Sequence, residues 1–188
     1  DDEVALVRES SLLVGRTLAE VARHIAPGMS TGKLDTLAEE FIRDNGGIPG
    51  FKGLYGCPST LLISVNEEVV HGLPGTRELR DGDVASVDCG VLMNDFYGDS
   101  AYTFCVGEVA PETRQLLWVT QECLKLGVAA AVENNRTGDI GHAIQSHAEK
   151  NGYGVVRELV GHGVGRKLHE APEVPNYGRR GQGVRLRS

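Results

Sequence analysis

The sequence predicts an α+β fold built from two similar halves. Apolar residues recur at helical spacing in two pairs of segments, one pair before residue 46 and one pair after Pro111. Short runs rich in β-branched and apolar residues lie between the pairs and predict strands. A chain of 188 residues, 40% of them hydrophobic, is long enough to bury a substantial core.

The first two helices are predicted near the N-terminus. One spans Val4–Ile25, where Pro27-Gly28 ends the apolar pattern. The other begins with Thr31 as its N-cap and ends at Asn45-Gly46, a common C-terminal signal. Both carry apolar residues along one face.

Strands are predicted in the extended segments that follow. Leu61–Val65, Val84–Leu92 and Tyr97–Val106 are short apolar runs separated by Gly, Asp and Asn turns. A further strand-like run, Val155–Val160, precedes a glycine-rich turn late in the chain.

The second pair of helices repeats the first. A long helix follows Pro111, and a shorter one spans Thr137–Lys150. Thr137 stands 106 residues after Thr31, and the Asn-Gly pairs that end the two shorter helices have the same separation. We interpret this as an internal duplication. The alternative, that threonine and glycine cap two unrelated helices, does not explain the shared order and spacing.

The duplication predicts the domain organisation. We expect one domain over residues 1–188, with a first half of about 1–106 and a second half of about 107–188. In the first half 61 residues separate Asn45 from Val106, whereas 37 residues follow Asn151. On this comparison the closing strands of the second half are missing, and we expect the natural chain to continue past Ser188.

Composition excludes several classes of protein. The formal net charge of −7 argues against DNA or another polyanion as the main partner. No apolar run approaches the ~20 residues that a membrane span needs, and the N-terminus does not resemble a secretion signal. The four cysteines are widely spaced, without a Cys-x-x-Cys pair, and we interpret them as reduced thiols. These features predict a soluble protein of the cytoplasm.

Two aspartates interrupt the predicted strands. Asp88 lies within one apolar strand and Asp99 opens the next, while Asn94-Asp95 forms a turn that would bring them together. Two buried carboxylates repel each other unless one is protonated or a cation lies between them, so their placement suggests a metal site. For either aspartate alone, a solvated strand edge is the alternative.

Histidines extend this set of candidates. His162 lies between Gly161 and Gly163, and glycines allow the backbone to crowd a site. One imidazole beside two carboxylates is a mixed N/O donor set, suited to Mn, Fe, Co or Zn. His71 and His169 also follow turns or strands, where each could act as a neutral donor or a proton carrier. A hydrogen-bonded loop histidine is the alternative for each.

The segments that carry these residues resemble the pita-bread metallopeptidases, and within them the type I methionine aminopeptidases. The resemblance covers the whole chain and is strongest at residues 64–74, 88–99 and 161–172. It implies a pita-bread fold, in which two pseudo-symmetric halves contribute an antiparallel sheet covered by helices. It also implies hydrolysis of the N-terminal methionine from nascent proteins.

The resemblance assigns a role to each candidate. It implies that Asp88 binds one of two divalent metal ions, that Asp99 bridges both, and that His162 binds the other. The ions would be Mn, Fe, Co or Zn, and would activate a bridging water. His71 and His169 would contact the scissile peptide.

The substrate pocket and the partners are implied in the same way. An apolar methionine pocket would be lined by Phe51, Cys57, Leu62 and Leu168. The substrate would be the N-terminal peptide of a nascent protein, met transiently at the ribosome by a monomeric enzyme. The family completes its metal site with two glutamates on strands beyond the equivalent of Arg187, and this sequence ends before them.

Two other functions remain open. A proline-directed peptidase of the same fold would prefer Ala-Pro peptides to Met-Ala peptides, and such relatives usually carry a large extra N-terminal domain. A non-catalytic binding module is the third possibility. The intact set of acids and histidines argues against it, because a module without catalysis has no physical reason to bury two acids among histidines.

Overall fold

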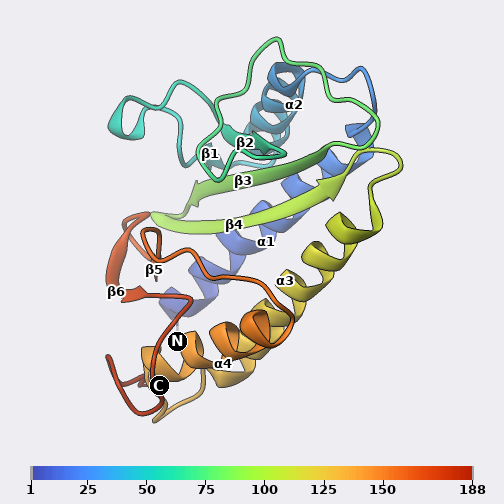
Figure 1. Ribbon diagram of the computed structural model, residues 1–188. Coiled ribbons are helices and arrows are strands. Elements are labelled where there is room, and N and C mark those ends of the chain that lie inside the picture. Colours follow the sequence, from blue (N-terminus) through green and yellow to red (C-terminus); the bar gives the residue numbers. More distant parts are fainter. Residues whose placement is uncertain (1, 188) are drawn as a thin grey trace. The chain divides into compact units, whose positions relative to one another are not determined.

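The computed structural model describes residues 2–187, which form two compact units (Figure 1). The first unit combines the chain up to Ala110 with Val164–Leu168. The second combines Pro111–Gly163 with the chain from His169 onward. Within the described residues, none of the helices is long and apolar enough to cross a membrane.

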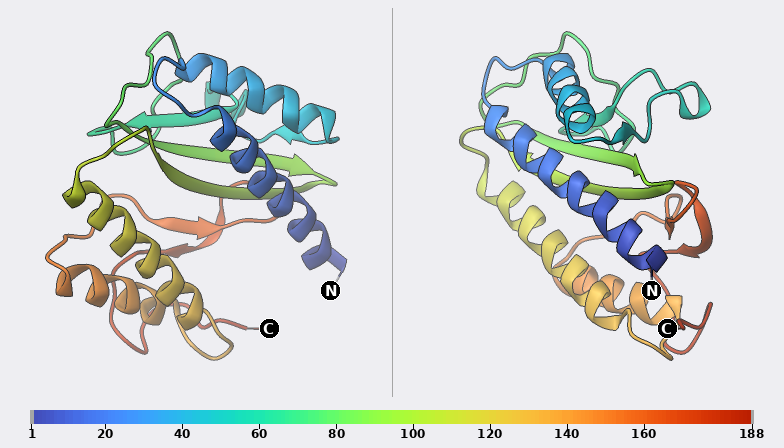
Figure 2. Two further views of the ribbon diagram at one scale, coloured as in Figure 1. Left: turned by 90° about the vertical axis from the view of Figure 1, so that its right-hand side faces the viewer. Right: turned by 180° about the vertical axis from the view of Figure 1, so that it is seen from behind.

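Two helices of the first unit pack against one face of its sheet (Figure 2). They are α1, Asp2–His24, and α2, Thr31–Asp44. The predicted N-cap of α2 is wrong by one residue, because the hydroxyl of Ser30 accepts the hydrogen bond from the N–H of Lys33 at 3.3 Å. Thr31 is the first helical residue, and its hydroxyl instead accepts a hydrogen bond from the N–H of Gly75 at 2.9 Å.

The sheet of the first unit is antiparallel and centred on β3. Its strands are β1, Ile48–Pro49; β2, Leu61–Val65; β3, Val84–Met93; and β4, Phe96–Cys105. β4 pairs along one edge of β3, while β1 and β2 follow one another along the other edge. A short 3-10 helix, η1, spans Leu54–Gly56 in the loop between β1 and β2.

The β3–β4 hairpin confirms the predicted turn. Asn94 and Asp95 both have positive φ, at 52° and 64°, as a two-residue type I′ turn requires. Met93 and Phe96 face each other across it. This turn sets the register of the whole hairpin.

The two faces of this sheet differ in chemistry. Alternate residues of β2 and β3, including Ile63, Val87 and Val91, are buried with residues of α1 and α2 in one hydrophobic core. Close approach of α1 is possible because Gly98 lacks a side chain, since a β-carbon there would lie 2.6 Å from the backbone of Ser10. The opposite face of the sheet carries Asp88.

The second unit contains two helices and a small antiparallel sheet. The helices are α3, Pro111–Ala130, and α4, Thr137–Lys150, and both agree with the prediction. The strands are β5, Gly161–Gly163, and β6, Glu170–Val174. The strand predicted over Val155–Val160 is wrong. Within the described residues no strand pairs with that segment. β-Branched residues favour a strand only where they can pack against a neighbouring strand and a core.

The predicted duplication is visible in the hydrogen bonds at the starts of α2 and α4. The N–H groups of Thr31 and Gly32 donate to the carbonyls of residues 77 and 75, at 2.9 and 2.8 Å. Those of Thr137 and Gly138 donate to the carbonyls of residues 184 and 182, at 2.9 and 3.0 Å. Each helix start is therefore held by a returning loop of its own unit in the same way.

All four cysteines are free thiols, as predicted. Burial raises the pKa of the Cys89 thiol, which favours its neutral form.

Candidate active site

Asp88 and Asp99 lie diagonally across the β3–β4 hairpin. Asp88 is opposite Ala101, and Asp99 is opposite Gly90. Directly opposed residues of an antiparallel pair project to the same side, so the two aspartates share one face of the sheet. This is the face turned away from α1 and α2.

The two carboxyl groups interact directly. Burial, the charge of Asp99 and a hydrogen bond with Asp99, in that order of size, raise the pKa of Asp88 to about 7. A hydrogen bond from the backbone N–H of Cys89 acts in the opposite direction. Near neutral pH the carboxyl group of Asp88 is therefore protonated part of the time. A nearby positive charge would stabilise its ionised form instead.

The acid pair has the chemistry of a site for a divalent cation. Two adjacent ionised carboxylates repel each other, and a cation between them removes that cost. Carboxylate oxygens are ligands that divalent metals accept. Within residues 2–187, groups of three or more His, Cys, Asp or Glu side chains that could hold a metal ion are not found. The first unit supplies the aspartates of the predicted ligand set.

Two residues of the predicted methionine pocket flank Asp88 on the same face. Leu62 is directly opposite Asp88 in the β2–β3 register. The buried ring of Phe51 lies against Gly90, where a β-carbon would be 2.6 Å from a ring carbon. The acid pair therefore has apolar neighbours along β3, as a pocket for an apolar side chain requires.

The other two predicted pocket residues lie on separate segments. Cys57 is half-buried after η1, and its thiol donates to the carbonyl of Ser59 at 3.6 Å. Leu168 is buried at the end of the Val164–Leu168 segment of the first unit.

His71 lies beside β2 in the first unit. The next residue, Gly72, donates its N–H to the Ser64 hydroxyl at 3.1 Å and accepts the N–H of Ile63 at 2.7 Å. A β-carbon at Gly72 would lie 2.3 Å from the Ile63 carbonyl oxygen, so only glycine fits there. The imidazole is exposed, and the backbone of His71 has a φ of 62°. These contacts fix the backbone that carries His71.

His162 and His169 lie together in the second unit. Their ring centroids are 4.4 Å apart and the ring planes meet at 59°. Nδ1 of His162 is 2.9 Å from the carbonyl oxygen of Gly163, a contact that favours a proton on Nδ1 and an unprotonated Nε2. An unprotonated Nε2 is the form that binds metals. Gly163 allows β5 to approach β6, because a β-carbon there would lie 2.6 Å from the Ala171 carbonyl oxygen.

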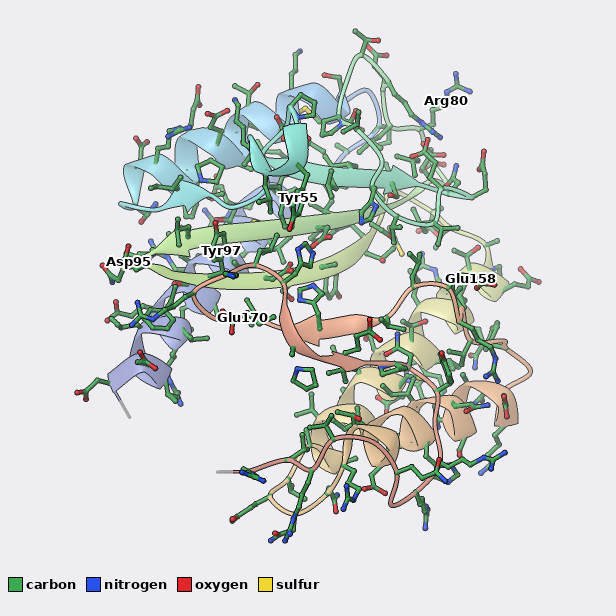
Figure 3. All side chains as sticks on the ribbon, turned by 90° about the vertical axis from the view of Figure 1, so that its left-hand side faces the viewer. Tyr55, Arg80, Asp95, Tyr97, Glu158 and Glu170 are labelled. Carbon is green, nitrogen blue, oxygen red and sulfur yellow. The ribbon has the colours of Figure 1, made fainter. Side chains whose placement is uncertain are left out.

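The segment between these histidines is part of the first unit. Gly165 accepts a hydrogen bond from the N–H of Tyr97, labelled in Figure 3, at 2.7 Å. The Arg166 guanidinium lies 4.5 Å from the centre of the Phe96 ring and forms an ion pair with Glu3 at 2.8 Å. A backbone hydrogen bond and a cation–π contact therefore link Val164–Leu168 to β4, and an ion pair links it to α1.

Sequence reasoning missed the residues that support these candidates. Ser64 anchors Gly72, and Gly90 makes room for Phe51. A glycine in the interior of a predicted strand is a sign of close approach, so Gly90 carried a recognisable signal. The anchoring role of Ser64 depends on a contact eight residues away, which spacing alone does not reveal.

Comparison with known proteins identifies a family. Residues 5–188 match the model for metallopeptidase family M24. The chain is 48% identical over 186 residues to the methionine aminopeptidase of Clostridium perfringens, an alignment that covers 99% of this chain and 75% of that protein. The chain thus spans about three quarters of the length of this relative.

Solved structures agree on the fold. The methionine aminopeptidase of Rickettsia prowazekii matches with a TM-score of 0.96 at 36% identity, over 98% of this chain and 75% of that one. A prolidase from Pyrococcus furiosus matches with a TM-score of 0.81 at 20% identity, over 95% of this chain and 52% of that one, and so shares the fold alone. Both confirm the predicted α+β architecture of pita-bread type.

Proposed function

The chain belongs to metallopeptidase family M24, and on that premise we propose that it is a methionine aminopeptidase, a hydrolase that removes N-terminal methionine from peptides. The observation that carries the proposal is the pair Asp88 and Asp99 on the open face of β3 and β4. Such a pair suits a metal-dependent hydrolase, and the chain has high identity to methionine aminopeptidases over nearly its whole length.

Asp88 and Asp99 would hold a divalent metal ion. We propose that Asp88 would hold one of two such ions, that Asp99 would contribute to holding both, that His162 would hold the other, and that the metal would be Mn, Fe, Co or Zn. When bound, the metal supplies a water of lowered pKa and polarises the peptide carbonyl. Burial and the adjacent charge of Asp99 raise the pKa of Asp88, and this supports the assignment because a cation beside the two carboxyl groups would offset both effects.

The other proposed residues bind and orient the peptide. His71 and His169 would hydrogen-bond the scissile peptide and stabilise charge that develops on its oxygen or nitrogen. Phe51, Cys57, Leu62 and Leu168 would receive the methionine side chain, an unbranched thioether suited to an apolar slot. The positions of Phe51 and Leu62 beside Asp88 support this part of the proposal.

The substrates and setting follow from this activity. N-terminal peptides of nascent proteins would be the substrates, met transiently at the ribosome in the cytoplasm. A monomer would suffice, because all the proposed residues come from one chain.

Peptide cleavage by the metal-stripped and reconstituted full-length protein tests the proposal. We expect Met-Ala-Ser to be cleaved after addition of Mn²⁺ or Co²⁺, and Ala-Pro-Ser to be cleaved at least 100-fold more slowly, since specificity is a ratio of kcat/KM values. Asp88→Asn should abolish metal-dependent turnover while leaving the protein folded. Faster cleavage of the Ala-Pro peptide would instead identify a proline-directed enzyme. Absence of metal-dependent cleavage and of metal uptake would favour a binding module.

A further inference from the structure

The loop between β1 and β2 leaves and rejoins the sheet directly beside Asp88. Gly50 donates its N–H to the Gly90 carbonyl at 2.7 Å, and Leu61 pairs with Cys89. The two ends of the loop are thus opposite consecutive residues of β3, and Asp88 is the next residue along.

Both ends of this loop are anchored to α2. The carboxylate of Asp35 accepts the N–H groups of Thr60 and Leu61 at 2.9 and 2.7 Å. At the other end, Lys52 forms an ion pair with Glu39 at 2.5 Å. These contacts hold both ends of the loop in place against α2.

The tip of the loop has an unusual backbone conformation. Gly53, Tyr55 and Gly56 all have positive φ, at 88°, 51° and 80°. Hydrogen bonds across the tip close it, including one from the N–H of Gly53 to the Cys57 carbonyl at 2.8 Å. A β-carbon on Gly53 or Gly56 would meet no described atom within 4 Å. Glycine is therefore favoured at these positions by the positive φ of the turn and not by close packing.

Tyr55 is the large side chain that this conformation presents. Figure 3 shows it on the loop, and 88% of its surface is accessible. A bulky residue at positive φ costs free energy, and the ring that this residue carries is exposed. Strained residues that project beside a catalytic centre are a recurring sign of ligand binding.

We propose that Tyr55 is a substrate-binding residue that contacts the peptide beyond its second residue. The inference rests on the proposed aminopeptidase function. Phe51, at the foot of the loop, lies over Gly90 next to the acid pair, whereas Tyr55 is four residues further along, at the tip. A peptide whose first residues occupy the face near Asp88 would extend past this tip.

A tyrosine suits this role because its aromatic ring offers a large uncharged face. Such a surface contacts extended peptides of many sequences without requiring a particular partner charge. An enzyme that trims many different N-termini needs that tolerance.

The test compares substrates of two lengths with three variants of the full-length protein. In Tyr55→Ala, KM for the tetrapeptide Met-Ala-Ser-Lys should rise about fivefold, a typical effect of losing one aromatic contact, while kcat stays within about twofold. KM for the dipeptide Met-Ala should not change. Tyr55→Phe, which keeps the ring, should behave as wild type.

Tyr55→Gly distinguishes the effect of losing the ring from the effect of the strained backbone. It removes the strain at positive φ as well as the ring, so it should match Tyr55→Ala in KM if the ring is responsible. Thermal unfolding of each variant checks that the substitution has not disrupted the fold.

Two outcomes would overturn the inference while leaving the aminopeptidase function intact. One is wild-type KM for the tetrapeptide in Tyr55→Ala, and the other is an equal rise for both substrate lengths. A wild-type protein that cleaves neither methionine peptide with added Mn²⁺ or Co²⁺ would overturn the proposed function and this inference together.

Discussion

Single residues of β3 decide how the first unit presents its acid pair. Asp88 and Asp99 share a face because side chains alternate along a strand, and burial, followed by the charge of the neighbouring Asp99, raises the pKa of Asp88. Gly90 lies opposite Asp99 and two residues from Asp88 on that face, and its lack of a side chain makes room for the Phe51 ring. Replacing a small residue here therefore acts on the pocket as well as on stability.

Gly90→Ala should lower the free energy of unfolding by about 1–3 kcal/mol, because overpacking forces neighbours to move. The new carbon would lie 2.6 Å from the Phe51 ring, so KM for methionine peptides should rise as well. Denaturant unfolding and steady-state kinetics measure the two effects. Gly15→Ala on α1 is the control, since a β-carbon there meets no described atom within 4 Å. If adding Phe51→Leu to Gly90→Ala recovers no stability, the ring contact is not the cause.

The carboxylate of Asp83 should make the stability of the protein depend on pH. This buried carboxylate accepts hydrogen bonds from Asn66 at 2.8 Å and from the N–H of Arg80 at 2.9 Å, and the bond from Asn66 is the main cause that lowers its pKa. A lowered pKa means that the stabilisation is present above the unfolded pKa of about 3.9 and is lost as pH falls through the folded value. Asp83→Ala should cost about 2 kcal/mol at pH 7.

Urea unfolding at pH 7, 5 and 3 tests this prediction. The gap in stability between wild type and Asp83→Ala should be nearly constant from pH 7 to 5 and should shrink at pH 3. Glu40→Ala, at an exposed position of α2, should leave stability unchanged at each pH. A gap that widens at pH 3 would contradict the assigned role of the carboxylate.

At the scale of elements, equivalent helices of the two halves are buried differently. Leu18 of α1 is 8% exposed, whereas Leu124 of α3, which is 106 residues later, is 66% exposed. Within its own unit α1 packs on β3 and β4, while α3 packs on α4. The two halves therefore share the boundaries of α2 and α4, which are 106 residues apart, but differ in how α1 and α3 pack.

The Val164–Leu168 segment carries the element-scale prediction. Arg166→Ala removes the ion pair with Glu3 and the contact with the Phe96 ring, which should loosen the segment by about 1 kcal/mol. Hydrogen exchange at the N–H of Tyr97, which donates to Gly165, should become about fivefold faster. Arg23→Ala, which removes an exposed ion pair within α1, is the control. Unchanged exchange at Tyr97 would show that Arg166 does not hold the segment.

For the molecule as a whole, the fold leaves the substrate open, because a prolidase shares it. Local sequence determined much of the architecture: α3, α4 and the β3–β4 turn lie where apolar periodicity and turn residues predict them, because these signals act within a few residues. It also singled out Asp88, Asp99 and the three candidate histidines by their unusual positions in strands and turns.

Tertiary structure alone decided the rest. Val155–Val160 has the composition of a strand but does not form one, because a strand must pair with a neighbouring strand and local sequence does not predict whether one lies beside it. The raised pKa of Asp88, the packing of Phe51 against Gly90 and the exposed ring of Tyr55 all depend on strand register and on the path of the loop between β1 and β2. Such contacts join residues distant along the chain, so their energies appear only once the sheet has formed.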